Sequence, residues 1–285
     1  MASPQTGIRD IYVDANGIRH HLIVRGQPGT PIVFMIHGLT GHAHSYDATA
    51  TSLAANYHVY CLDVRGRGES GWGKPSDYHA GTYVEDLEQI RKALGIERFT
   101  LVGTWMGGLI ALRYVPDHQQ NVVGIVLNDI GPEVDAAGAS RIRSFIADAP
   151  RMFPDPKAVV HFYQEKWAPL ISGLPDDRLE EFARHHVRKD DNGVWVWKMD
   201  PAIRTLDQPA PPLDTWTNFD SITSPILAIR RSESDVLTTP IAKRMTELNE
   251  RCKIIEVPGG PAPFLTEPTA WSALQEFLAG LQLAA

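Results

Sequence analysis

The stretch that decides the fold is Leu101-Val-Gly-Thr-Trp-Met-Gly-Gly108. An apolar run over residues 99–102 leads into it, and residues 108–115 lead out with a composition that suits a helix. The glycines on both sides of the bend permit a tight turn and a close approach of helix to strand. This layout predicts a strand, a sharp turn and a helix, with one side chain presented at the tip. That side chain is Trp105, whose indole offers no nucleophilic atom.

Apolar runs and helical segments continue along the chain. A hairpin is predicted around Asn16-Gly17, because Asn-Gly between apolar runs favours a tight turn. Further on, continuous apolar strands alternate with helices, which is typical of a mostly parallel sheet with helices on both faces. Strands are predicted at residues 10–13, 18–24, 31–36, 57–63, 99–102, 122–127, 225–229 and 253–257, and helices at residues 45–57, 82–94, 108–115 and 269–281.

One long segment breaks this alternation. It holds three helix-like stretches and then the proline-rich residues 208–212; the stretches are residues 137–149, 156–166 and 175–187. We interpret residues 133–216 as a helical cap, inserted into a core formed by residues 1–132 and 217–285. Ligands of open α/β sheets bind beyond the carboxyl ends of the strands. We therefore expect a pocket between the cap and this edge of the core.

Composition narrows the class of protein. The chain has 285 residues, of which 43% are hydrophobic, so a sizeable core is expected. A net charge of −7 argues against nucleic acid and anionic membranes as partners. Cys61 and Cys252 lie in apolar runs and are predicted to be buried free thiols in a reducing compartment. With neither a signal peptide nor a membrane span recognisable in the sequence, we expect a cytoplasmic protein.

Several motifs follow the predicted strands, and their order along the chain carries a resemblance. The motifs are His37-Gly-Leu-Thr-Gly41, Asp63-Val-Arg-Gly-Arg-Gly-Glu-Ser70, the bend at residues 103–108, Asn128-Asp-Ile-Gly-Pro-Glu133, Ser234-Asp235 and Pro258-Gly-Gly-Pro-Ala-Pro263. In this order the sequence resembles the α/β-hydrolase fold family, and among its members small bacterial enol-lactonases and carboxylesterases. The resemblance implies a mostly parallel eight-stranded sheet flanked by helices, with a helical cap insert.

The resemblance also implies site residues, and two of them depart from the family pattern. The family's nucleophile position is Trp105 here, and its acid position is Asp235. The late histidine of the family is replaced by Pro261, in a loop that is one residue short. The backbone N–H groups of Leu39 and Met106 correspond to the family's oxyanion hole.

These departures predict that native ester hydrolysis is abolished. Trp105 cannot attack a carbonyl, and Pro261 supplies no base, so the Ser-His machinery of the family is missing. Deliberate redesign is the favoured origin, because the changes fall on catalytic positions while the neighbouring glycines are retained. Natural decay of a hydrolase is the competing origin.

The leading interpretation is a repurposed pocket that binds a small aromatic or ester-like ligand. Trp105 would offer a stacking face at the pocket floor. Asp235, if buried among apolar groups, would have a raised pKa and act as a general base. Arg231 would stabilise a developing anion, or else pair with Asp235 and depress the pKa of that carboxyl. His42 follows the oxyanion loop and is placed in the pocket lining.

Two alternatives stay open. In the first, the chain is a natural pseudo-hydrolase that binds a ligand or partner without turnover. In the second, it is an esterase or lactonase in which a histidine or hydroxyl near Leu39 serves as a surrogate nucleophile. No cofactor and no metal are predicted, because neither a phosphate-binding glycine loop nor a close ligand cluster occurs in the sequence.

Overall fold

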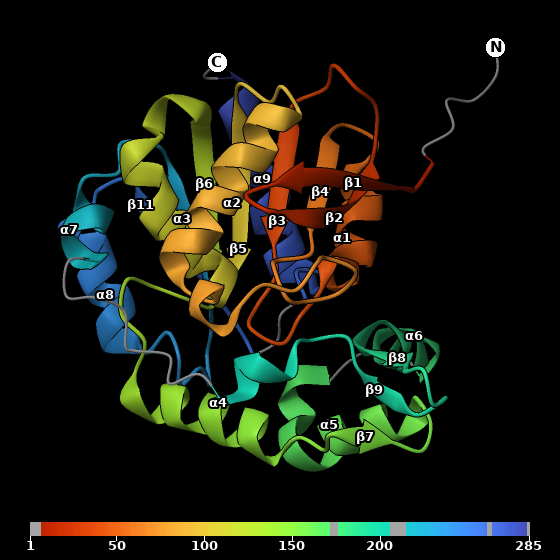
Figure 1. Ribbon diagram of the computed structural model, residues 1–285. Coiled ribbons are helices and arrows are strands. Elements are labelled where there is room, and N and C mark those ends of the chain that lie inside the picture. The colour runs from red at the N-terminus through yellow and green to blue at the C-terminus, as the bar shows by residue number, and fades with distance from the viewer. Residues whose placement is uncertain (1–6, 172–175, 206–214, 261–263, 284–285) are drawn as a thin grey trace.

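The computed structural model describes residues 7–171, 176–205, 215–260 and 264–283. A twisted central sheet with helices on both faces forms the core, and a smaller group of elements lies against one end of it, at the bottom of Figure 1. Among the described helices, none combines the length and the apolar character needed to cross a membrane.

The core sheet contains eight strands, and each corresponds to a strand predicted from the sequence. They are β1 (Arg9–Ala15), β2 (Ile18–Arg25), β3 (Ile32–Ile36), β4 (His58–Leu62), β5 (Phe99–Thr104), β6 (Val122–Asn128), β10 (Ile226–Arg231) and β11 (Cys252–Val257). Their order is β1-β2-β4-β3-β5-β6-β10-β11. Strand β2 runs antiparallel to β1 and β4, and the other neighbouring pairs are parallel. The predicted fold class is confirmed.

Helices cover the two faces of this sheet, which the alternation of side chains along each strand explains. Val33 and Met35 of β3 pack in the cluster that contains α1 (Asp47–Leu53) and α9 (Pro268–Leu283). Phe34 and Ile36 point the other way, into the cluster that contains residues of α2, α3 and α8. The bounds of these three helices are Ala80–Ala93, Met106–Tyr114 and Thr239–Leu248. Both faces of the sheet are therefore buried, as its near-continuous apolar strands require.

Two helical predictions differ from the structure. Residues 43–46 form the 3-10 helix η1 (Ala43–Tyr46), so α1 begins later than expected and ends at Leu53. Helix α8 was not predicted, although Thr238 followed by Pro240 is a typical start signal. Short 3-10 turns elsewhere are η2 (Pro75–Asp77), η3 (Val115–Asp117), η4 (Gln119–Asn121) and η5 (Pro201–Thr205).

The cap segment contains the three predicted helices and also a small sheet that the sequence did not predict. Helices α4 (Ala136–Asp148), α5 (Lys157–Ile171) and α6 (Asp176–His186) match the three predicted stretches. A small antiparallel sheet accompanies them, in the order β7-β9-β8, with bounds Met152–Phe153, Trp195–Trp197 and Val187–Lys189. Gly193 has a φ of +77° and turns the chain between β8 and β9. Helix α7 (Thr215–Asp220) follows and contacts α3.

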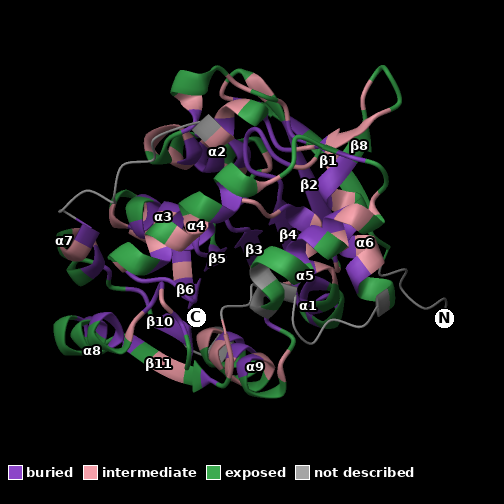
Figure 2. Ribbon diagram, turned by 90° about the horizontal axis from the view of Figure 1, so that it is seen from below, coloured by how far each residue is buried: buried purple, intermediate pink, exposed green. Residues whose placement is uncertain are grey.

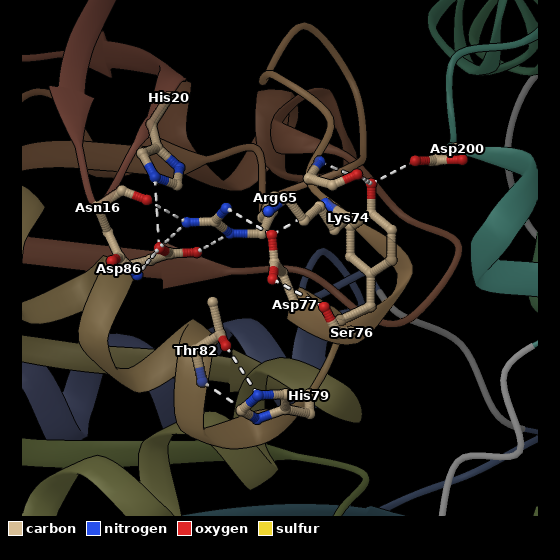
Figure 3. Close-up of polar contacts among 12 residues, drawn as sticks. Asn16, His20, Arg65, Lys74, Ser76, Asp77, His79, Thr82, Asp86 and Asp200 are labelled. Atoms are coloured by element: carbon tan, nitrogen blue, oxygen red, sulfur yellow. Dashed lines mark hydrogen bonds and ion pairs between the residues drawn. The ribbon is translucent and has the colours of Figure 1, made fainter.

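A polar network holds the loop after β4, on which part of the cap rests. Arg65 donates to both carboxylate oxygens of Asp86, at 2.6 and 2.9 Å, and to the carbonyl of Asn16 at 2.7 Å. Figure 3 shows how these three residues lie. The hydroxyl of Tyr78 donates to the carboxylate of Asp200, which belongs to the cap. Because these groups are largely buried, the loop is fixed from the core side and tied to the cap from the other.

Candidate functional site

The elbow predicted from the sequence is present between β5 and α3. Trp105 stands at its tip with φ +47° and ψ −109°. A Cβ atom on Gly103 would lie 2.4 Å from the backbone of Gly107, and one on Gly107 would lie 2.0 Å from the carbonyl oxygen of Ile36. Neither contact is possible, so both glycines are required by the packing of helix against strand whatever side chain the tip carries.

The indole of Trp105 is buried at the carboxyl edge of the sheet. Its Cε3 atom would lie 2.8 Å from a Cβ built on Gly38, so the ring lies directly against the loop after β3. Its Nε1 donates to a carboxylate oxygen of Asp129 at 3.3 Å. A bulky residue with positive φ costs of order 1–3 kcal/mol, and burial of the ring offsets that strain.

Trp105 lines a narrow cavity between the core and the cap. Aromatic rings from the cap, Tyr163 and Phe182, face it from the other side together with His186. Burial lowers the pKa of His186 to about 3 and that of His37, on the core side, to about 4, so both imidazoles are neutral near pH 7. The cavity volume is about 20 Å³, which is room for one or two water molecules.

His37 fixes the backbone of the loop that flanks Trp105. Its Nε2 accepts a hydrogen bond from the N–H of Val64 at 3.0 Å, and its Nδ1 donates to the carbonyl of Gly38 at 2.7 Å. The bond accepted by Nε2 needs a neutral ring, which agrees with the lowered pKa. Leu39 follows in this loop, and Met106 begins α3 after the tip, so the two residues implied for an oxyanion hole lie on the segments on either side of Trp105. Their role stays a prediction.

Asp129 is a site residue that sequence reasoning missed. It follows β6 with φ +55°, is fully buried, and accepts the indole N–H of Trp105 and the backbone N–H of Arg231 at 3.2 Å. Desolvation raises the pKa of its carboxyl above the ordinary value. The motif Asn128-Asp-Ile-Gly-Pro-Glu133 contains a signal for this residue, because Asp tolerates positive φ at a strand end.

Asp235 does not occupy the environment expected for a general base. Its carboxylate accepts two hydrogen bonds from Arg141 of α4, at 2.6 and 2.5 Å, and its side chain is 35% exposed. The Arg141 guanidinium holds the pKa of this carboxyl below its usual value. The expected rise in its pKa is therefore wrong. Because Arg141 belongs to the cap, Asp235 joins the cap to the core.

Arg231 also differs from the expectation. Its guanidinium donates to the carboxylate of Glu267, and to the carbonyl of Phe264 at 3.2 Å. The predicted pairing of Arg231 with Asp235 is therefore wrong, since each residue has another ionic partner. Arg231 is buried, and these bonds direct its charge toward the start of α9.

His42 is buried at the junction of core and cap. Its Nε2 lies 2.9 Å from Nδ1 of His186, which also lies 2.8 Å from the carbonyl of Phe182. Desolvation lowers the pKa of His42 well below its ordinary value. His42 lines a second cavity of about 20 Å³, together with His185 and His186. The sequence placed His42 in a pocket lining but gave no sign of its partner, which lies in the cap.

Two hydroxyls that line the cavity beside Trp105, those of Thr104 and Ser45, are already engaged. The hydroxyl oxygen of Thr104 accepts hydrogen bonds from Tyr46 at 2.7 Å and from Asn128 at 3.0 Å. The hydroxyl of Ser45 accepts the N–H of His42 at 3.3 Å. Neither geometry joins a hydroxyl to a basic side chain, as an activated nucleophile requires. Pro261, the position implied for the late histidine, lies outside the described residues.

Comparisons with known proteins give the relationships of the chain. A model of the alpha/beta hydrolase fold family matches residues 31–189. The chain is 27% identical to the 3-hydroxybutyrate-oligomer hydrolase of Cupriavidus necator, over 98% of this chain and 99% of that protein. It is 27% identical to an esterase of Mycobacterium tuberculosis, over 73% of this chain and 68% of that protein. The crystal structure of an alpha/beta hydrolase from Novosphingobium aromaticivorans superposes with a TM-score of 0.86 at 29% identity, covering 95% of this chain and 98% of that one.

Proposed function

Because the chain belongs to the α/β-hydrolase fold family, we propose that it keeps the hydrolase scaffold but binds a small, uncharged aromatic or ester-like ligand without triad chemistry. The observation that carries the proposal is Trp105 at the tip of the elbow, where its indole donates to Asp129. An indole N–H is a donor only, so this position cannot form an acyl intermediate.

The ligand class rests on what surrounds the cavity. Trp105, Tyr163 and Phe182 supply ring faces, and His37 and His186 are neutral there. Aromatic faces favour planar apolar ligands, with stacking worth about 0.5–1.5 kcal/mol beyond burial. A charged ligand would be desolvated with no opposite charge among the described lining residues.

Entry of such a ligand requires the cap to move. The cavity has a volume of about 20 Å³, far below the roughly 300 Å³ or more of a site for a drug-sized ligand. Tyr163 and Phe182 come from the cap, so displacement of the cap widens the cavity from one side while Trp105 stays in place. The bound state is therefore an opened form of the fold described above.

The main argument for deliberate redesign was the retention of the glycines around the elbow, and packing gives this retention another explanation. Gly103 and Gly107 are required by the packing of helix against strand alone. Their retention follows equally from natural decay. Sequencing of close natural relatives decides between the two, since a relative with both Trp and Pro at positions 105 and 261 contradicts redesign.

Turnover of a p-nitrophenyl ester tests the loss of triad chemistry. The unaltered chain is expected to be inert, and Trp105→Ser combined with Pro261→His is expected to show turnover. Trp105→Ser alone is the matched control, because it restores the hydroxyl without the base. A burst and steady turnover by the unaltered chain overturn the proposal.

That result would instead support a hydrolase with a surrogate nucleophile. This second candidate is favoured by two of the relatives described above, an oligomer hydrolase and an esterase. Trapping the acyl-enzyme and mapping the modified residue by mass spectrometry would identify the nucleophile.

Binding is tested separately by calorimetry with methyl benzoate as the probe. Benzoate serves as its charged counterpart of nearly the same shape. We expect methyl benzoate to bind more tightly than benzoate, and Trp105→Ala to weaken that binding about tenfold, the loss that a stacking contact of about 1.4 kcal/mol predicts. Equal binding of the two probes, or no effect of Trp105→Ala, contradicts the proposed ligand class.

A further inference from the structure

A histidine cluster lies at the junction of core and cap, outside the cavity that Trp105 lines. His44 comes from η1, Asp47 begins α1, and His185 lies in the last turn of α6. Figure 2, which views the molecule from the cap side, shows α6 next to the part of the core that holds α1. The ring of His185 stacks on that of His44, with centroids 3.5 Å apart and planes 17° apart.

The donor atoms of these residues converge. One ring nitrogen from each histidine and one carboxylate oxygen of Asp47 all lie within 4.8 Å of one another. Nδ1 of His44 is 2.8 Å from Oδ2 of Asp47. Two ligands of a tetrahedral zinc ion, each about 2.0 Å from the metal, are separated by roughly 3.3 Å. Because the two rings are stacked with nearly parallel planes, both imidazoles would also have to rotate before their nitrogen lone pairs could point to one ion.

Neighbouring groups orient the carboxylate of the cluster. The other carboxylate oxygen of Asp47 accepts a hydrogen bond from the guanidinium of Arg25 at 2.6 Å, which orients the carboxylate as an outer contact does in metal sites. Among the described residues, no hydrogen bond engages either ring nitrogen of His185. Buried next to the cluster, Nδ1 of His42 has no partner in the described structure.

We propose that His44, Asp47 and His185 form a binding site for a transition-metal dication of the zinc class, which joins the cap to the core. Two imidazoles and one carboxylate are ligands that zinc accepts, and water would take a fourth position. Magnesium prefers oxygen ligands and is excluded by this donor set. Because the ligands come from both parts of the molecule, bound metal would hold α6 against η1 and keep the cap closed.

Calorimetry of the full chain, stripped with a chelator and titrated with Zn²⁺, tests the site. We expect one zinc ion per chain, confirmed by metal analysis after gel filtration, and no heat from Mg²⁺. Failure of the wild-type chain to bind zinc stoichiometrically overturns the proposal, and so does equal binding of Mg²⁺. In that case the stacked rings and the His44–Asp47 bond are structural contacts only.

Variants test whether the bound zinc ion lies at this cluster. His185→Ala removes the cap ligand and is expected to weaken zinc binding at least about tenfold. His161→Ala is the matched control, since His161 is an exposed histidine of the same cap that lies outside the cluster. Its zinc affinity is expected to equal that of the wild type. Unchanged binding by His185→Ala, or an equal loss in His161→Ala, contradicts the assignment.

The thermal midpoint supplies a readout that does not depend on affinity alone. Zn²⁺ is expected to raise the midpoint of the wild type and to slow protease cleavage of the cap, with neither effect in His185→Ala. Both proteins are compared in chelator first, so that any folding defect of His185→Ala appears before metal is added. His185→Gln, which keeps a polar side chain, serves if the alanine variant does not fold. Zinc that binds without protecting the cap contradicts the closure.

Discussion

Trp105 has a backbone conformation that large side chains rarely adopt, with φ +47° and ψ −109°. The surrounding packing imposes it, because Gly103 and Gly107 bring the helix onto the strand and leave the chain no other path. The indole fits there because Gly38 makes room for it and Asp129 accepts its N–H. A single residue therefore combines backbone strain with favourable burial.

This combination predicts an unusual order of stability for two variants. Trp105→Gly and Trp105→Ala both delete the indole, but only glycine adopts positive φ without strain. We expect Trp105→Gly to unfold at a higher urea concentration, with a free energy of unfolding about 1 kcal/mol larger than that of Trp105→Ala. The opposite order, which is usual at ordinary positions, would show that the elbow relaxes when the ring is removed.

His37 predicts how stability depends on pH. Burial lowers its pKa from 6.5 to about 4 in the folded state, so the unfolded chain binds more protons between these values. The free energy of unfolding is therefore intact above pH 6.5 and is lost as pH falls toward 4, by about 2 kcal/mol between pH 7 and pH 5 from this residue. We expect His37→Asn to lose that much less over the same interval in urea unfolding. Parallel curves for both proteins would contradict this.

At the scale of elements, the strands could be predicted well from the sequence and the cap only in part. Continuous apolar runs bounded by turns mark the eight core strands, since both faces of this sheet are buried. Strands β8 and β9 escaped because each is only three residues long, shorter than any reliable alternation. The partners of Asp235 and His42 escaped because Arg141 and His186 reach them across the cap, and no local pattern records such contacts.

The packing of α3 on β5 and β3 yields a sharp pair of predictions. Gly107→Ala places a methyl group 2.0 Å from the carbonyl oxygen of Ile36, so we expect an insoluble protein or one destabilised by more than about 4 kcal/mol. Gly280→Ala in the exposed part of α9 meets nothing within 4 Å and should stabilise the fold by about 0.5–1 kcal/mol. Soluble expression and urea unfolding compare the two. Similar behaviour of both variants would refute the role given to Gly107.

At the scale of the whole molecule, polar contacts join the cap to the core at several places. Arg141 pairs with Asp235 on one side, and Tyr78 donates to Asp200 on another. At a third place His42 meets His186. The cavity beneath is narrow, so the position of the cap decides what reaches Trp105.

The Arg141–Asp235 pair allows one contact between cap and core to be measured as a coupling free energy. Both side chains are about one-third exposed, so a double-mutant cycle with Arg141→Ala and Asp235→Ala should give a coupling free energy of only about 0.5–1 kcal/mol, and less in high salt. Hydrogen exchange in α4 should accelerate in both single variants. A coupling of zero at low salt, with unchanged exchange, would show that this pair does not hold the cap.

Two of the three glycines of the elbow, Gly107 and Gly108, have a consequence for how such proteins are classified. A Cβ on Gly107 would collide with the carbonyl of Ile36. A Cβ on Gly108 would lie 2.2 Å from Cγ2 of Ile130. Neither constraint involves position 105. Similarity judged by these glycines therefore reports a shared fold. The side chain at the tip of the turn can change while the glycines around it are kept.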